Sequence, residues 1–127
     1  MHTSEVVKIL QELEQSGLCG EVLFQKFTSA TRGERKLACA LHGFLLSESR
    51  DAYLRYLLAR VRPAAAALIL SENAAGLAAL DAHAPFTEAL TDEFLKTAIS
   101  SGAQESLVWL LRHKAECFGF RDRDFSL

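Results

Sequence analysis

Two pairs of cysteine and histidine residues carry the side chains most able to bind a metal ion. Cys39 and His42 are three residues apart, and His113 and Cys117 are four residues apart. Either spacing places both side chains on one face of a helix, and two cysteines with two histidines are a donor set suited to Zn²⁺. The two pairs belong to predicted helices far apart in the chain, and neither has a standard zinc-binding spacing. We therefore predict no metal and no other cofactor, and we expect buried cysteines and surface histidines instead.

The sequence contains no catalytic motif. It has neither a Gly-x-Ser-x-Gly elbow nor a glycine-rich phosphate loop. The adjacent acids Asp92 and Glu93 are expected to begin a helix, where acidic side chains favour the helix dipole. His83 follows Asp81 closely and precedes Pro85, an ordinary arrangement for a loop. We predict that the protein is not an enzyme.

A basic segment, residues 32–62, suggests nucleic-acid binding as an alternative function. Arginines and tyrosines are interleaved within it: Arg50, Tyr53, Arg55, Tyr56, Arg60 and Arg62. Arginine binds phosphates and tyrosine stacks on bases. However, residues 31–62 carry a net charge of +4 and residues 72–105 a net charge of −5, in a chain with a pI of about 6.1. The acidic stretch would repel a long polyanion, which favours a solvated helix face over a nucleic-acid site.

Alanine and leucine dominate the composition, since the 127 residues include 21 Leu and 19 Ala but only 8 Val and Ile together. Ala and Leu favour helices and β-branched residues favour strands, so we predict one all-α domain over residues 1–127. The longest apolar run, residues 64–70, is far shorter than the roughly 20 residues of a membrane span. No secretory signal is visible, and three cysteines without a CxxC pair fit a reducing compartment. These features predict a cytoplasmic protein without a membrane segment.

Apolar residues recur at helical spacing in about eight short segments. Thr31 and Glu34 have the spacing of a capping box and predict the start of the third helix. Pro63 is expected to stop the fourth helix and to occupy the first position of the fifth. Thr91 or a near neighbour is expected to cap the seventh helix, and Gly102 to end it in a left-handed conformation. Short turns between the segments predict antiparallel helix pairs.

The predicted pairs share an internal pattern. Their turns fall near Ser49, Asn73 and Gly102, and each turn is followed by a helix that ends in a leucine cluster. Such helices cannot cover their apolar residues alone, so neighbouring pairs must stack. The expected order is capping helices in residues 1–31, helix pairs in 32–116 and an aromatic, charged tail in 117–127.

The last pair, residues 93–115, resembles an ankyrin repeat. The residues that match are Leu95, Ala98, Gly102, Glu105, Leu107, Leu110, Leu111 and Ala115. The segment departs from the family at Phe94, Lys96 and Lys114, where ankyrin repeats have Pro, His and Gly. The resemblance implies a short ankyrin-like or α-solenoid stack that binds a protein partner along one face.

The function predicted from this resemblance is a non-enzymatic protein–protein interaction module. In stacked helix pairs, the first helix of each pair forms the binding face, which suggests Lys36, Glu93 and Lys96. Residues on the second helices are alternatives: Tyr53, Tyr56, Arg60 and Trp109. Trp109 lies toward the edge of its helix's apolar stripe. The tail aromatics, such as Phe118, are expected to pack on the last two helices, or else to form a docking strand or a cut end.

Overall fold

The protein is described by a computed structural model that covers residues 2–48 and 50–119. These residues form eight α-helices and no strand, which confirms the predicted all-α fold. The helices are α1 (Thr3–Ser16), α2 (Gly20–Ser29), α3 (Gly33–Leu45), α4 (Asp51–Leu58), α5 (Val61–Leu70), α6 (Ala74–His83), α7 (Glu88–Ser101) and α8 (Gln104–Cys117). None of them is long and apolar enough to cross a membrane. Residues 120–127, which make up most of the predicted tail of residues 117–127, lie outside the described residues. Ser49, near which a turn was predicted, also lies outside them.

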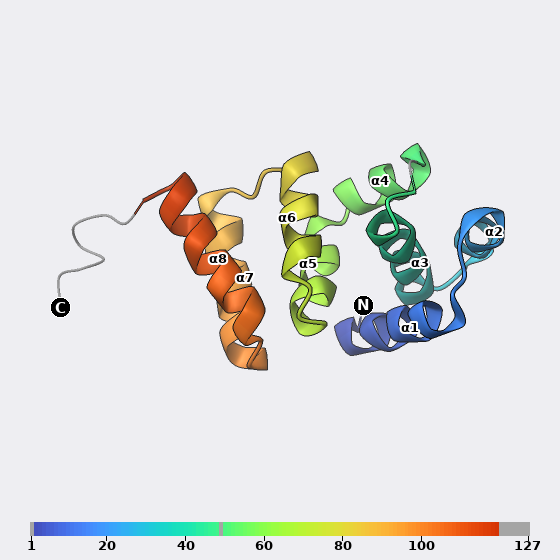
Figure 1. Cartoon of the computed structure of the whole chain (residues 1–127), viewed down its shortest axis with the longest axis horizontal. Coiled ribbons are helices and arrows are strands. Elements are labelled where there is room, and N and C mark those ends of the chain that lie inside the picture. Colours follow the sequence, from blue (N-terminus) through green and yellow to red (C-terminus); the bar gives the residue numbers. More distant parts are fainter. Residues whose placement is uncertain (1, 49, 120–127) are drawn as a thin grey trace.

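The helices are arranged in a row along the long axis of the molecule (Figure 1). At one end, α7 packs against α8, and α5 packs against α6 beside them. The two pairs contact each other through both of their helices, because α5 also packs against α7 and α6 packs against α8. Toward the other end, α3 packs against α4, and α4 makes a smaller contact with α5.

The first two helices have different positions in this row. The sequence placed residues 1–31 together at one end of the stack, and α2 does lie at that end, against α3 (Figure 1). In contrast, α1 packs against both α3 and α5. Therefore α1 connects the α3–α4 pair to the α5–α6 pair.

Each helix pair is joined by the same kind of turn. Ser47, Glu72 and Gly102 follow α3, α5 and α7 with φ values of 62°, 56° and 68°. In each turn, the residue after this left-handed position donates its backbone N–H to a carbonyl five residues earlier, at 3.1, 2.9 and 2.9 Å. This bond satisfies a carbonyl at the helix end that has no partner within the helix. The left-handed conformation predicted for Gly102 is confirmed.

Several predicted helix ends differ from the structure. The residue before α3 is Arg32, and no side chain caps this helix, so the predicted capping box of Thr31 with Glu34 is wrong. The cap of α7 is Thr87, whose side chain accepts a hydrogen bond from the N–H of Leu90. Pro63 is the third residue of α5 and not the first. It is tolerated there because no N–H in the first turn has a partner within the helix.

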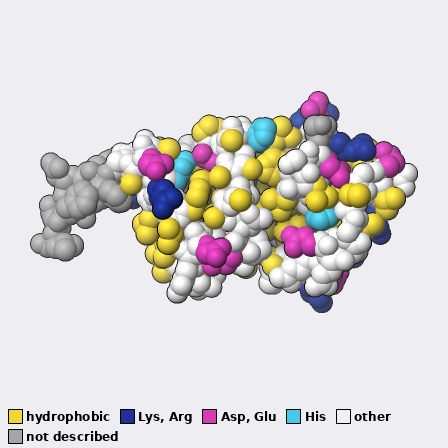
Figure 2. All heavy atoms as spheres, viewed as in Figure 1, with side chains coloured by type: hydrophobic (Ala, Val, Ile, Leu, Met, Phe, Trp, Pro, Cys, Tyr) yellow, Lys and Arg dark blue, Asp and Glu magenta, His cyan; other side chains and the backbone are white. Residues whose placement is uncertain are grey.

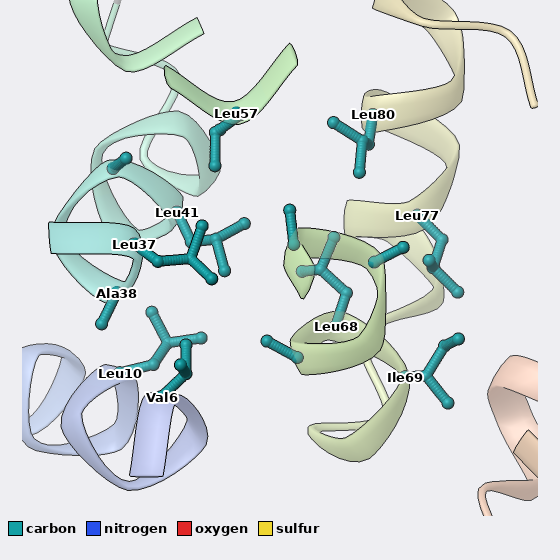
Figure 3. Packing of buried hydrophobic residues seen from close by; sticks show 14 of the residues in the cluster. Val6, Leu10, Leu37, Ala38, Leu41, Leu57, Leu68, Ile69, Leu77 and Leu80 are labelled. Carbon is teal, nitrogen blue, oxygen red and sulfur yellow. The ribbon is translucent and has the colours of Figure 1, made fainter. Parts of the chain in front are cut away.

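The core forms one continuous cluster from α1 to α8. Figure 3 shows Val6 and Leu10 of α1 pointing toward Leu37 and Leu41 of α3. All four side chains are at most 1% exposed, and the cluster continues through α5 and α6 by way of Leu68 and other residues. Small side chains fill the α5 interface, where three alanines are fully buried: Ala64, Ala65 and Ala67. Their size allows α1 and α7 to pack closely against α5.

Glu72 links the α5–α6 turn to the start of α8. Its carboxylate oxygens accept hydrogen bonds from the backbone N–H groups of Ser106 and Glu105, each at 3.1 Å. These N–H groups lie in the first turn of α8 and have no partner within the helix. The bonds from Ser106 and then Glu105 lower the pKa of Glu72 below its ordinary value of 4.5.

We expect Glu72→Gln to reduce the stability of the protein at neutral pH but not in acid. Because the folded-state pKa of Glu72 is lowered, its ionised form stabilises the folded protein above the unfolded pKa, and this contribution is lost as the pH falls through the folded pKa. Urea unfolding at about pH 7 and about pH 3 measures the free energy of unfolding of both proteins. The difference between wild type and variant should disappear in acid. Glu12→Gln, at an exposed position of α1, is the control. An equal difference in stability at both pH values would contradict the stabilising role of the ionised Glu72 carboxylate.

Candidate interaction surface

Three of the residues predicted from the sequence meet on one surface. Lys36, Tyr56 and Arg60 form what we call the basic–aromatic face, and the buried ring of Phe27, 5% exposed, lies beneath it. The guanidinium carbon of Arg60 lies 3.8 Å from the ring centroid of Tyr56. The Nζ of Lys36 lies 5.8 Å from the same centroid and 5.0 Å from that of Phe27. The two rings meet edge to face, with centroids 5.5 Å apart.

The ends of four helices bring these side chains together. Phe27 lies near the end of α2, and Lys36 lies in the first turn of α3. Tyr56 lies in the last turn of α4, and Arg60 immediately precedes α5. The sequence placed Arg60 on the fourth helix, but α4 ends at Leu58. The side chains meet because α3 packs against both α2 and α4.

The cations of the basic–aromatic face are held without acidic partners. Within the described residues, neither Lys36 nor Arg60 forms an ion pair, whereas Arg50 pairs with Glu21 at 3.0 Å and Arg62 with Glu93 at 2.9 Å. Contact with the aromatic rings is favourable for both cations and restricts their movement. The face therefore presents positive charge that is positioned but not neutralised. Figure 2 shows that, on the side in view, Lys and Arg lie mainly over the end formed by α1–α4, apart from a patch near α8.

Tyr53 supports this face from below and is not part of its surface. Its side chain is only 1% exposed, which is too little for the partner contact that the sequence suggested. The ring meets those of Phe27 and Phe24 edge to face, with centroids 5.1 and 5.9 Å away. Burial raises the pKa of the Tyr53 hydroxyl to about 12, and the charge of Glu48 adds to this shift. The hydroxyl has no hydrogen-bond partner among the described residues.

The other three predicted residues lie toward the opposite end of the molecule. Glu93 and Lys96 are exposed on α7, and Glu93 pairs with Arg62. Trp109 of α8 is half-buried and stacks on His113, with ring centroids 4.8 Å apart. These residues do not join the basic–aromatic face.

The acidic pair Asp92 and Glu93 does not begin a helix as predicted. Helix α7 starts at Glu88, so both acids lie in its second turn. Asp92 accepts a hydrogen bond from Lys114 of α8 at 2.8 Å, and Glu93 pairs with Arg62. The two acids therefore connect α7 to α8 and to α5. These contacts account for their position without the helix dipole.

The two cysteine–histidine pairs differ from the expectation of buried cysteines and surface histidines, because both histidines are buried and one of the two cysteines is exposed. His42 is 4% exposed, and its Nε2 lies 2.9 Å from the carbonyl oxygen of Leu18. Cys39 is buried, and this burial raises its pKa. His113 is 9% exposed, whereas Cys117 is exposed. In the part of the chain that the structure describes, no three His, Cys, Asp or Glu side chains are grouped to hold a metal ion.

A hollow of about 470 Å³ lies beside the α3–α4 turn and the end of α6. Its walls include Phe44, Leu54, Ala79 and His83, and the rings of Phe44 and His83 meet with centroids 5.7 Å apart. The sequence placed His83 in a loop near Asp81, but it is the last residue of α6. The lining residues come from α3, α4 and α6, which are separate in the sequence, so no local sequence pattern could have indicated this hollow.

Comparison with family models, with curated proteins and with solved structures finds no match to this chain.

Proposed function

We propose that this protein is a non-enzymatic protein–protein interaction module of the helical-repeat type, and that its basic–aromatic face binds an acidic segment of a partner protein. The main support for the proposal is the position of Lys36 and Arg60 over aromatic rings, where neither cation forms an ion pair among the described residues. A surface with two positioned cations beside one half-buried aromatic ring suits the carboxylates of an acidic segment. Three free cysteines support a location in a reducing compartment such as the cytoplasm.

The packing of the helix pairs supports the helical-repeat class. The α5–α6 and α7–α8 pairs lie side by side with matching helices in contact, and three pairs share one type of turn. This arrangement is typical of stacked helix pairs, in which one pair covers the apolar side of the next. The ankyrin-like pattern of residues 93–115 falls on α7 and α8, which is consistent with the same class.

Nucleic-acid binding is the alternative function, and the positions of Tyr53 and Tyr56 argue against it. Base stacking requires an open aromatic ring face. Tyr53 is 1% exposed, and Arg60 lies 3.8 Å from the ring centroid of Tyr56. Tyr53 therefore offers no platform to a base, and the Arg60 guanidinium covers one face of the half-buried Tyr56 ring. The arginines Arg50 and Arg62 are also paired with glutamates, which reduces the charge available for phosphates.

The proposal predicts that reversing both charges of the face abolishes most binding to an acidic peptide. We expect the double variant Lys36→Glu, Arg60→Glu to bind a fluorescent peptide rich in Glu and Leu about tenfold more weakly or worse, which corresponds to about 1.4 kcal/mol. Fluorescence anisotropy at low and moderate salt measures this affinity. Salt should weaken the wild-type affinity because exposed charges are screened.

The matched control changes the net charge equally at sites away from the face. Lys8 on α1 and Arg112 on α8 are both exposed, so Lys8→Glu, Arg112→Glu should leave peptide affinity within about twofold of wild type. A single-stranded RNA of equal charge is measured in parallel. The proposal is wrong if the wild type does not bind the peptide, if both double variants lose affinity equally, or if the RNA binds more tightly than the peptide.

A further inference from the structure

Three side chains with complementary chemistry meet at the end of α8. Cys117 Sγ lies 3.6 Å from His113 Nδ1, one helical turn earlier. The other ring nitrogen of His113, Nε2, lies 3.3 Å from Asp81 Oδ1 of α6. This second contact is at ion-pair distance but lacks the alignment of a hydrogen bond. A thiol, an imidazole and a carboxylate in this order form the arrangement of a nucleophile, a base and the group that orients the base.

The position of the His113 ring is fixed by its surroundings. The ring is 9% exposed and stacks on Trp109, with an angle of 10° between the planes. Phe86 and Phe118 contact it edge to face, with centroids 6.0 and 6.2 Å away. Asp81 is also held in place, because its Oδ1 accepts the backbone N–H of Phe86 at 2.8 Å. Little reorganisation is therefore needed to bring the base to the thiol.

The His113 ring lies between the Cys117 thiol and two groups that attract a cation. An imidazolium at this position would face the Asp81 carboxylate and the π system of Trp109, and both stabilise a cation. Cys117 becomes a thiolate in the same step. The C-terminus of a helix disfavours a negative charge, so α8 itself works against the thiolate. Any gain in reactivity must therefore come from His113 and Asp81.

We propose that Cys117 is a reactive thiol and a site of reversible modification by small disulfides. The thiol proton moves to His113 Nδ1, and the thiolate attacks one sulfur of the disulfide. A new bond forms between Cys117 Sγ and this sulfur while the original S–S bond breaks. The second sulfur leaves as a thiolate and takes up the proton from His113, so no other oxidant is needed.

The other two cysteines provide internal references. Cys39 is buried and 1% exposed, and this burial disfavours its thiolate. Cys19 is exposed like Cys117 but lies just before α2, and no histidine contact is present at its sulfur within the described residues. A change in the His113 site should therefore alter the reaction of Cys117 and leave that of Cys19 unaffected.

The test is the rate at which each cysteine of the full chain reacts with hydroxyethyl disulfide, an uncharged probe, followed by mass spectrometry of its peptides. The variant His113→Phe keeps a ring against Trp109 but removes both nitrogens, and we expect Cys117 to react about tenfold more slowly in it. Asp81→Asn keeps the oxygen that accepts the Phe86 N–H and removes only the charge, and it should slow Cys117 by about threefold. Cys19 should react at the wild-type rate in both variants.

The outcomes separate chemical activation from a general effect on folding. If His113→Phe fails to fold, as judged by circular dichroism, Asp81→Asn alone decides the matter. The proposal is overturned if Cys117 reacts at the same rate in wild type and folded variants, or if Cys19 and Cys117 slow down together.

Discussion

Replacing Gly43 with alanine is expected to destabilise the protein by about 2 kcal/mol, although alanine is the better helix former. A Cβ atom at this position of α3 would lie 2.3 Å from Cε2 and 2.6 Å from Cδ2 of Tyr53. The Tyr53 ring cannot easily move, because Phe24 and Phe27 pack against it. The clash therefore outweighs the gain of up to about 1 kcal/mol in helix propensity. Chemical denaturation of both proteins measures the loss.

A double-mutant cycle identifies the cause of this loss. In a Tyr53→Leu background the ring is absent, so Gly43→Ala should be neutral or stabilising, with a coupling of about 2 kcal/mol between the two sites. If Gly43→Ala costs the same in both backgrounds, the close packing of α3 on Tyr53 is not the reason.

Truncating Leu10 should cost about 3 kcal/mol, within the usual range for a buried leucine. Leu10 is 1% exposed on α1, the helix that packs against both α3 and α5. We expect Leu10→Ala to lower the stability of the whole domain in one cooperative transition, as measured by thermal and urea unfolding.

The matched control for Leu10→Ala is Leu111→Ala on α8. Leu111 is 44% exposed, so its truncation should change stability by less than about 1 kcal/mol. Equal losses for the two variants, or a separate early transition for residues of α1, would contradict the role of α1 as the connection between helix pairs.

The fold class and the turns were predictable because they depend on local physics. The apolar residues of each helix repeat at helical spacing, and glycine favours the left-handed position at Gly102. The turn at Glu72 was harder to place, because a residue other than glycine adopts the left-handed conformation there, with φ 56°. The Glu72 side chain also accepts a hydrogen bond from the first turn of α8, and this contact between helices has no local sequence signal. The cap of α7 at Thr87 was also missed, because Thr91 has the same residue type and follows by one helical turn.

The leucine clusters show a limit of sequence reasoning about exposure. Leu57 and Leu110 are fully buried, but their neighbours Leu58 and Leu111 are 39% and 44% exposed. Consecutive helical residues point about 100° apart, so a pair of leucines does not reveal which one faces the core.

The candidate sites were predictable only in part. Lys36, Tyr56 and Arg60 were singled out by residue type, but the contribution of Phe27 depends on how α2 packs against α3. His113 and Cys117 were paired by their spacing, whereas Asp81 joins them only through the contact of α6 with α8. Spacing along one helix can be derived from the sequence, and contacts between helices cannot.

NMR can show whether the basic–aromatic face binds an acidic protein segment, as we propose. The most direct measurement is a titration of isotope-labelled protein with the Glu- and Leu-rich peptide, followed by NMR of the backbone amides and the Tyr56 ring. We predict that the largest chemical-shift changes fall on Phe27, Lys36, Tyr56 and Arg60, at the meeting point of α2, α3 and α4. Changes that instead centre on α7 and α8, or no changes at saturating peptide, would contradict binding at the basic–aromatic face.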